Sequence, residues 1–174
     1  MGVLGDACLE HERIALLPLK PFFNHYNELA NCDEAKGSNC CEWVGIECNT
    51  TTKRLIGLSL HSTRYEDEGW YLNASMFLSF VEFKSLNLQG NSIVGCIENE
   101  DEMHLRLTEL EQLDLSNNLF RNNTFSFLKG LSSLKSLTMV VNNLQGSLDI
   151  KGLEISRNLT VLDLSENWIE SLES

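Results

Sequence analysis

Apolar residues recur at short and regular intervals through most of the chain. In four stretches, residues 83–95, 110–120, 134–146 and 159–169, two apolar residues flank one polar residue, and an asparagine follows three positions after the second. Alternation of this kind is typical of a β-strand, whereas an amphipathic helix repeats its apolar positions every 3.6 residues. Each stretch is therefore predicted to contain a short strand whose two apolar side chains face the interior.

The four stretches fit one longer template, L-x-x-L-x-L-x-x-N-x-L, in which phenylalanine, methionine or isoleucine replaces leucine at some positions. The template asparagines, 27, 24 and 25 residues apart, are Asn91, Asn118, Asn142 and Asn167. A fainter copy at residues 55–65 has Thr63 in place of the asparagine. This template, at a period of 20–29 residues, identifies the leucine-rich repeat. We therefore predict an α/β solenoid, a right-handed superhelix or horseshoe of about five repeats over residues 54–174, incomplete at the C-terminus.

The asparagines have a mechanical role in this prediction. Each one follows the strand at the point where the chain must turn beneath it. The amide side chain both donates and accepts hydrogen bonds, so it can satisfy backbone groups that a buried turn would leave unpaired. Stacked repeats are then expected to form a ladder of asparagines, a continuous leucine core and a concave face lined by parallel strands.

The first repeat of a solenoid needs a cover for its apolar edge. Residues 8–53 are the only candidate, and their first part, CLEHERIALLPLKPFF, has the pattern of a helix that is charged and then apolar. We expect Ile14, Leu16 and Leu17 to face the first repeat, and the helix to bend or end at Pro18. Residues 1–7 are interpreted as the remnant of a leader or as disordered.

Five of the six cysteines lie in the first 48 residues, which indicates an oxidising compartment. Cys40 and Cys41 are adjacent, so they are expected to bond to different partners: Cys8 to Cys40, and Cys41 to Cys48 in a small loop that carries Trp43. A zinc site is the alternative, but the sequence has neither a C-x-x-C pair nor an H-x₃₋₅-H pair. For Cys32 and Cys96 we expect two free thiols.

This part of the chain resembles the N-terminal cap of plant leucine-rich-repeat receptors. The resemblance rests on Cys8-x-Glu10-x-Glu12-Arg13-x-Ala15-Leu16-Leu17-x-Leu19-Lys20, on CCEWVGIEC, and on LIGLSL after it. It is greatest to the plant receptor-like proteins, which have extracellular repeats and a membrane span but no kinase, and LDLSNN and LDLSEN are phrases of the same class. The resemblance implies the same two disulfides.

The sequence departs from that family at two kinds of position. Cys32 stands where such caps usually have a tryptophan. The G-x-I-P phrase that usually closes a plant repeat appears without its proline, as Gly95-Cys96-Ile97 and Gly146-Ser147-Leu148. The missing proline argues against the second strand that accompanies this phrase in plant repeats.

Charge and composition narrow the classes of partner. The 43% hydrophobic content predicts a folded chain, and the net charge of −12 argues against binding to nucleic acid. No apolar run reaches the roughly 18 residues of a membrane span, and no signal peptide is visible, so we expect membrane attachment only through a segment absent from this chain. Four acceptors for asparagine-linked glycans, Asn49, Asn73, Asn122 and Asn158, agree with a location on the extracellular side of the plasma membrane.

The family resemblance implies a protein or peptide ligand and a co-receptor kinase, which meet the surface of the solenoid. We predict that the outward positions of the strands form the binding face: Lys84, Ser85, Asn87, Gln89, Glu111, Gln112, Asp114, Ser116, Lys135, Ser136, Thr138, Val140, Thr160, Val161, Asp163 and Ser165. The alternative is that these first repeats are only a scaffold for recognition elsewhere.

Nothing in the sequence predicts a cofactor, a metal site or an enzyme. The acidic inserts at 65–70 and 98–103 lack the pattern of a calcium loop and are interpreted as solvated loops. The histidines are isolated from any residue pattern that would supply a nucleophile and its base. Two other functions stay open, a secreted polygalacturonase-inhibitor-like protein, since those inhibitors share this cap, and a truncated product without function.

Overall fold

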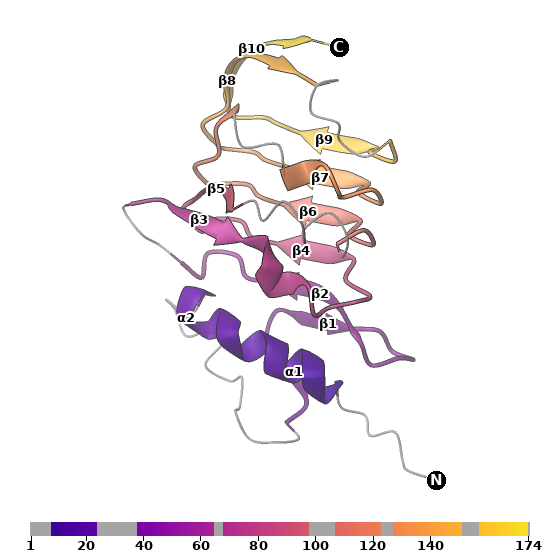
Figure 1. The fold of residues 1–174 in the computed structure, drawn as a ribbon. Coiled ribbons are helices and arrows are strands. Elements are labelled where there is room, and N and C mark those ends of the chain that lie inside the picture. The colour runs from indigo at the N-terminus through magenta and orange to yellow at the C-terminus, as the bar shows by residue number, and fades with distance from the viewer. Residues whose placement is uncertain are drawn as a thin grey trace.

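The computed structural model describes residues 8–23, 38–64, 68–97, 107–122, 127–150 and 157–173. These residues form successive coils stacked in one direction, with a helical segment covering the end at which the chain starts (Figure 1). The fold is the expected leucine-rich-repeat solenoid with a disulfide-bonded cap. Residues 1–7, Cys32 and the insert at 98–103 lie outside the described residues, as does the first half of the insert at 65–70.

The cap begins with α1 (Glu10–Leu16), which passes into the 3-10 helix η1 (Leu17–Leu19) and then into α2 (Lys20–Phe23). Pro18 lies in the first turn of η1, so α1 ends before the proline, as predicted. Proline lacks the backbone N–H that an α-helix would need at this position, and a change of helix type removes that need.

One stripe of the cap helices is buried, and it differs from the expected stripe. Leu16, Leu19 and Phe23 are at most 3% exposed, and Glu12 lies on the same stripe with an exposure of 0%. Leu17 packs against the core while partly exposed, but Ile14 is 52% exposed, so its predicted contact with the first repeat is wrong. The buried positions recur at intervals of three and four residues, which is the period of one helix face, and Ile14 lies off that face.

The main sheet has six strands in the order β1-β2-β4-β6-β7-β9. They are β1 (Ile46–Cys48), β2 (Leu55–Ser59), β4 (Ser85–Asn87), β6 (Gln112–Asp114), β7 (Ser136–Thr138) and β9 (Val161–Asp163). Only the first pair is antiparallel, because β1 belongs to the cap and the others are the repeat strands. The central leucine of each repeat strand is in register with the next, and these residues are Leu58, Leu86, Leu113, Leu137 and Leu162.

Gly45 allows the cap strand to approach the first repeat closely. Its φ is +80°, and a Cβ atom there would lie 2.3 Å from the carbonyl oxygen of Ser59. The backbone N–H of Ser59 donates to the Gly45 carbonyl at 2.7 Å. A side chain at this position is therefore excluded both by the left-handed conformation and by the contact.

A second set of strands lies beside the main sheet, against the sequence-based expectation. β3 (Trp70–Asn73) pairs in parallel with β5 (Ile93–Ile97), and β8 (Gln145–Asp149) pairs in parallel with β10 (Trp168–Glu173). The two phrases without proline lie inside β5 and β8. Strand pairing uses backbone N–H and C=O groups, and proline removes an N–H, so its absence does not prevent these strands from forming.

The core fills the space enclosed by each coil. It consists mainly of leucines and of phenylalanines that pack against one another, such as Phe77 and Phe80 on Phe83, with ring centroids 6.1 and 5.6 Å apart. The 3-10 helix η3 (Ala74–Phe77) carries part of this core and is capped by the side chain of Asn73, which accepts a hydrogen bond from the Ser75 amide. Among the described residues, α-helix is confined to the cap.

Candidate functional site

The repeat strands align their outward residues in rows across the sheet. The residues before the central leucines, Ser85, Gln112, Ser136 and Val161, are paired in register, and so are those after them, Asn87, Asp114, Thr138 and Asp163. Neighbouring strands lie about 4.8 Å apart, so each row presents side chains at that interval. The register thus brings these eight predicted residues together in rows on one face of a continuous sheet.

A third row, next to the start of the strands, carries alternating charges. The backbone N–H of Glu111 donates to the carbonyl of Lys84, and that of Lys135 donates to the carbonyl of Glu111. The Lys135 Nζ lies 2.7 Å from the Glu111 Oε2, and this hydrogen bond lowers the pKa of the Glu111 carboxyl. Thr160, the predicted residue in the next coil, donates its backbone N–H to Lys135.

Three residues of the row after the central leucine also stabilise the turn that follows. Asn87 Oδ1 accepts from the Gln89 amide at 2.9 Å, and Asp114 Oδ1 accepts from the Ser116 amide at 2.9 Å. Asp163 Oδ1 accepts from both the amide and the hydroxyl of Ser165, and the hydroxyl hydrogen bond is the main cause of the lowered pKa of Asp163. These side chains therefore have a structural role in addition to lining the face.

The structure removes Ser116 from the predicted face. Its side chain is 6% exposed, and its hydroxyl oxygen accepts a hydrogen bond from the backbone N–H of Val140 in the next coil. Serine is small enough to be covered by that neighbouring coil, and its oxygen satisfies a backbone donor there. The equivalent residues of the flanking coils are more open, because Gln89 and Ser165 are exposed and Val140 is partly exposed.

The asparagine side chains connect each coil to the coil before it. Asn118 Nδ2 donates to the Leu115 carbonyl of its own coil and to the Leu88 carbonyl of the preceding coil, both at 3.0 Å. Its Oδ1 accepts from the backbone N–H groups of Asn91 and Ile93, also of the preceding coil. Every template asparagine donates to its own and to the preceding coil in this way, namely Asn91, Asn118, Asn142 and Asn167.

Thr63 fits the same scheme at the first coil. Its hydroxyl donates to the carbonyl of Leu60 at 2.8 Å, three residues earlier, as each asparagine does within its own coil. A threonine lacks the second donor that an asparagine uses to reach the preceding coil. The first coil follows the cap rather than another repeat, so that second bond is not required there.

The cap is fastened by two disulfides that start from adjacent cysteines. Cys8 is bonded to Cys40 and Cys41 to Cys48, the pairing proposed from the sequence. Cys40 and Cys41 lie in the 3-10 helix η2 (Cys40–Glu42), which joins α1 on one side to β1 on the other. Cys96 lies in β5, whereas Cys32 is outside the described residues, so the expectation of two free thiols stays a prediction.

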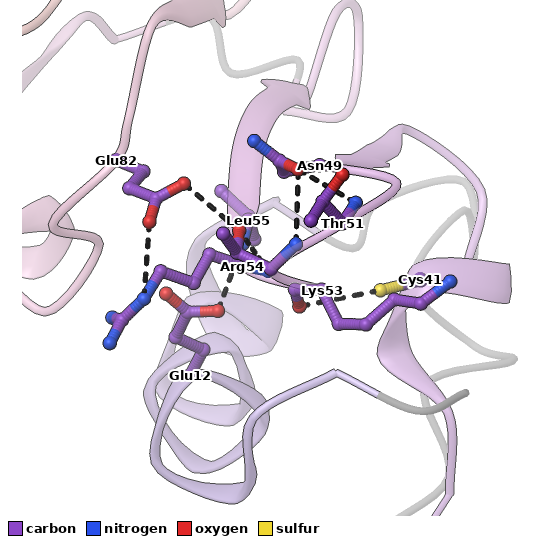
Figure 2. Close-up of polar contacts among 9 residues, drawn as sticks. Glu12, Cys41, Asn49, Thr51, Lys53, Arg54, Leu55 and Glu82 are labelled. Atoms are coloured by element: carbon purple, nitrogen blue, oxygen red, sulfur yellow. Dashed lines mark hydrogen bonds and ion pairs between the residues drawn. The ribbon is translucent and has the colours of Figure 1, made fainter. Parts of the chain in front are cut away.

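Polar side chains hold the seam between the cap and the first coil (Figure 2). Glu12 Oε2 accepts a hydrogen bond of 2.9 Å from the backbone N–H of Leu55, the first residue of β2. Arg54 Nε lies 3.2 Å from Glu82 Oε1. Asn49 closes the turn before β2, because its Oδ1 accepts from the amide of Thr51 at 2.8 Å.

An aromatic cluster forms a second contact between cap and solenoid. Trp70 on β3 stacks on Phe22 of α2 with centroids 6.1 Å apart, and meets Phe23 edge-on at 5.6 Å. The guanidinium of Arg64 lies 4.2 Å from the centre of the Trp70 ring, within the range of a cation–π interaction. Sequence reasoning missed this cluster, because no local pattern pairs Phe22 with a residue nearly fifty positions away.

The four predicted glycan acceptors differ in what their amides do. Asn49 and Asn73 use Oδ1 to close a turn and to cap η3. Asn122 uses both atoms, since Nδ2 donates to the Gln145 carbonyl at 2.6 Å and Oδ1 accepts from the Gln145 amide at 2.9 Å. Asn158 Nδ2 donates to a carbonyl of the preceding coil. A glycan replaces one of the two hydrogens of Nδ2, so an amide that donates a single hydrogen bond through Nδ2 can keep that bond when it carries a glycan.

Sequence comparison places this arrangement among known plant proteins. The family model of the leucine rich repeat N-terminal domain matches residues 9–49. Over 168 residues the chain is 37% identical to Receptor-like protein 9a of Arabidopsis thaliana, an alignment that covers 94% of this chain and 17% of that protein. The chain therefore spans about a sixth of the length of that relative.

Solved structures from the same plant have the same fold. A chain in the complex of BIR3 and SERK2 is 25% identical, with a TM-score of 0.69 over 91% of this chain and 82% of that one. The receptor kinase HAESA, solved with the peptide hormone IDA and the co-receptor SERK1, is 20% identical, with a TM-score of 0.64 over 93% of this chain and 30% of that one. No helix in the described part of this chain is long and apolar enough to cross a membrane. In its cap and its repeats, the chain is similar to the N-terminal part of plant leucine-rich-repeat receptor-like proteins.

Proposed function

We propose that the chain is the membrane-distal part of a plant cell-surface receptor in defence or developmental signalling. In this proposal residues 8–53 form the cap, residues 54–174 form the first repeats, and the solenoid lies on the extracellular side of the plasma membrane. The disulfides of the cap support the location, because such bonds persist in oxidising compartments. The four acceptor asparagines, Asn49, Asn73, Asn122 and Asn158, are proposed as glycan sites.

The proposed ligand is a protein or a peptide, bound without catalysis on the concave rows of the sheet. The observation that supports this role is the register of the rows, which fixes polar side chains at intervals of about 4.8 Å on a rigid surface. An extended peptide rises about 3.3 Å per residue, so a short stretch of it spans several neighbouring strands of the rows. HAESA was solved with a peptide hormone and a co-receptor, and a SERK protein is present in the BIR3 complex, so a co-receptor kinase is included as a partner.

The test uses synthetic copies of peptides that plants secrete. Isothermal calorimetry measures the affinity of each peptide for the purified chain. Gln112 and Ser136 lie side by side at the centre of the rows, so Gln112→Arg with Ser136→Arg places two bulky cations there. We expect a peptide that binds the wild-type chain to bind this variant at least about tenfold more weakly, a loss of about 1.4 kcal/mol.

The matched control adds the same two charges away from the strands. Val44→Arg with Val81→Arg replaces two valines that are 59% and 55% exposed and lie outside the rows. This control is expected to bind like the wild-type chain. Equal binding by both double variants would place the ligand elsewhere, and a panel in which no peptide binds would favour the scaffold interpretation of these repeats.

A further inference from the structure

Glu12 is a fully buried acidic residue at the seam between cap and solenoid. It lies on α1 with 0% of its surface exposed, on the stripe that otherwise carries leucine and phenylalanine. Its Oε2 accepts a hydrogen bond from the backbone N–H of Leu55, 43 residues further along the chain (Figure 2). The cap helix is thus joined to the first repeat strand through a carboxyl group.

The other oxygen of Glu12 has no such partner. Oε1 is buried and accepts no hydrogen bond within the residues that the structure describes. A buried carboxylate is normally paired with a cation or with several donors, because an ion loses its hydration when it is buried. One donor for two oxygens leaves the ionised form of Glu12 poorly compensated.

The charged groups that face Glu12 do not supply the missing partner. Arg54 directs its Nε to Glu82 Oε1 at 3.2 Å, and Glu82 Oε2 accepts from the hydroxyl of Thr52 at 3.0 Å. His11, on the same helix, and Arg54 favour the ionised form of Glu12, while Glu82 disfavours it. Burial outweighs these contributions and raises the pKa of Glu12 above its ordinary value.

We propose that this seam is a proton-dependent latch, in which α1 is held most firmly against the first coil while Glu12 is neutral and is released as Glu12 ionises. The disulfide between Cys8 and Cys40 keeps the start of α1 attached, so the release is a local opening and not a loss of the cap. The latch sets how firmly the solenoid's first coil is covered at a given pH.

The direction of the pH dependence follows from the two states of the seam. Well below pH 4.5, the ordinary pKa of a glutamate, Glu12 is neutral in both the closed and the open state, and closure is at its firmest. As the pH rises, the open state ionises first, which favours opening until the closed state also ionises. Closure therefore weakens from about pH 4.5 upward and levels off above the raised pKa.

The experiment measures hydrogen exchange of the Leu55 amide, the donor to Glu12, in the full chain. The protection factor, which removes the intrinsic pH dependence of exchange, is expected to fall several-fold between pH 4.5 and neutral pH in the wild-type chain. In Glu12→Gln the side chain keeps its shape and an acceptor but cannot ionise, so the protection factor is expected to stay constant. A constant protection factor in the wild-type chain would overturn the latch.

Glu109→Gln is the matched control, because it removes one carboxyl from an exposed position far from the cap. This variant is expected to follow the wild-type profile, and a fall of equal size in Glu12→Gln would also overturn the proposal. A direct reading comes from the carboxyl carbon shifts of the wild-type chain, which need no variant. Glu12 is expected to titrate above the ordinary pKa of a glutamate, and titration at that ordinary value would contradict the proposal.

Discussion

In each coil, the residue directly before the template asparagine or threonine adopts a left-handed backbone conformation. The φ values are +53° at Ser62, +71° at Gly90, +53° at Asn117, +55° at Val141 and +56° at Glu166. Glycine and asparagine tolerate this region, whereas a β-branched residue is strained in it. Val141 therefore carries local strain that the tight turn beneath the strand imposes on it.

Replacing Val141 by asparagine, the residue at the equivalent position of the preceding coil, is expected to stabilise the chain. The gain is about 1 kcal/mol, because the substitution relieves a conformation that costs about 1–3 kcal/mol for an unfavourable residue. In thermal unfolding followed by circular dichroism this corresponds to a rise in Tm of about 2–4 °C. The control is Val140→Asn, whose backbone is not left-handed. A similar gain in both variants would show that polarity, and not backbone conformation, is responsible.

Comparing Glu12 with the cysteines and the template asparagines shows which single-residue roles a sequence can predict. The cysteines and asparagines were predictable because their spacing is periodic or local. The role of Glu12 was not, because its hydrogen bond comes from Leu55 and a charge that acts on it from Glu82, which are distant in sequence. The burial of Ser116 likewise depends on how closely the next coil packs, which the template does not encode.

At the scale of the element, the template asparagine supplies hydrogen bonds to buried backbone groups, which an apolar residue of similar size cannot supply. Asn142 illustrates this, because its Nδ2 donates to the carbonyls of Leu115 and Met139 while its Oδ1 accepts from the amide of Phe120. Its side chain is 4% exposed. Removal of the amide leaves these backbone groups without partners and without access to water.

Asn142→Ala is therefore expected to lower the free energy of unfolding by about 3 kcal/mol, the sum of several buried groups left unsatisfied. The adjacent Asn143 is exposed, so Asn143→Ala is the matched control and should change stability by less than about 0.5 kcal/mol. Urea unfolding measures both. If the two variants lost equal stability, the local backbone preference of asparagine, and not the hydrogen bonds of the ladder, would determine the effect.

The strands of the second set were missed for an identifiable reason. The family phrase contains a proline, and its absence was interpreted as loss of the strand. In the structure β5 and β8 form through backbone pairing with β3 and β10. The main strands were predicted correctly because their two inward side chains leave a period of two in the sequence, whereas a backbone-paired strand with mixed burial leaves no such pattern.

At the scale of the whole molecule, the cap is joined to the solenoid by covalent and non-covalent contacts. The Cys8–Cys40 bond closes a separation of 32 residues, and the Cys41–Cys48 bond closes one of 7. A longer loop loses more conformational freedom in the unfolded chain when it is closed. The first bond is therefore expected to contribute more to stability than the second.

Removal of Cys8–Cys40 by double substitution to alanine is expected to cost about 4 kcal/mol, and removal of Cys41–Cys48 about 2.5 kcal/mol. Urea unfolding of the two variants, each with the other bond intact, measures the difference. Reduction of both bonds in the wild-type chain should lower the free energy of unfolding by more than either double substitution does. If the short loop proved to contribute more, loop closure would not be the source of the stabilisation.

The backward direction of the asparagine bonds has a consequence for the order in which the molecule is built. Each asparagine supplies partners to the coil that precedes it, as Asn118 does for Asn91 and Ile93. A newly synthesised coil thus remains unfinished until the following one has left the ribosome, while everything nearer the N-terminus is already complete. Construction proceeds from the cap outward, and an interruption after any coil leaves unmet the amides that the next asparagine would have bonded.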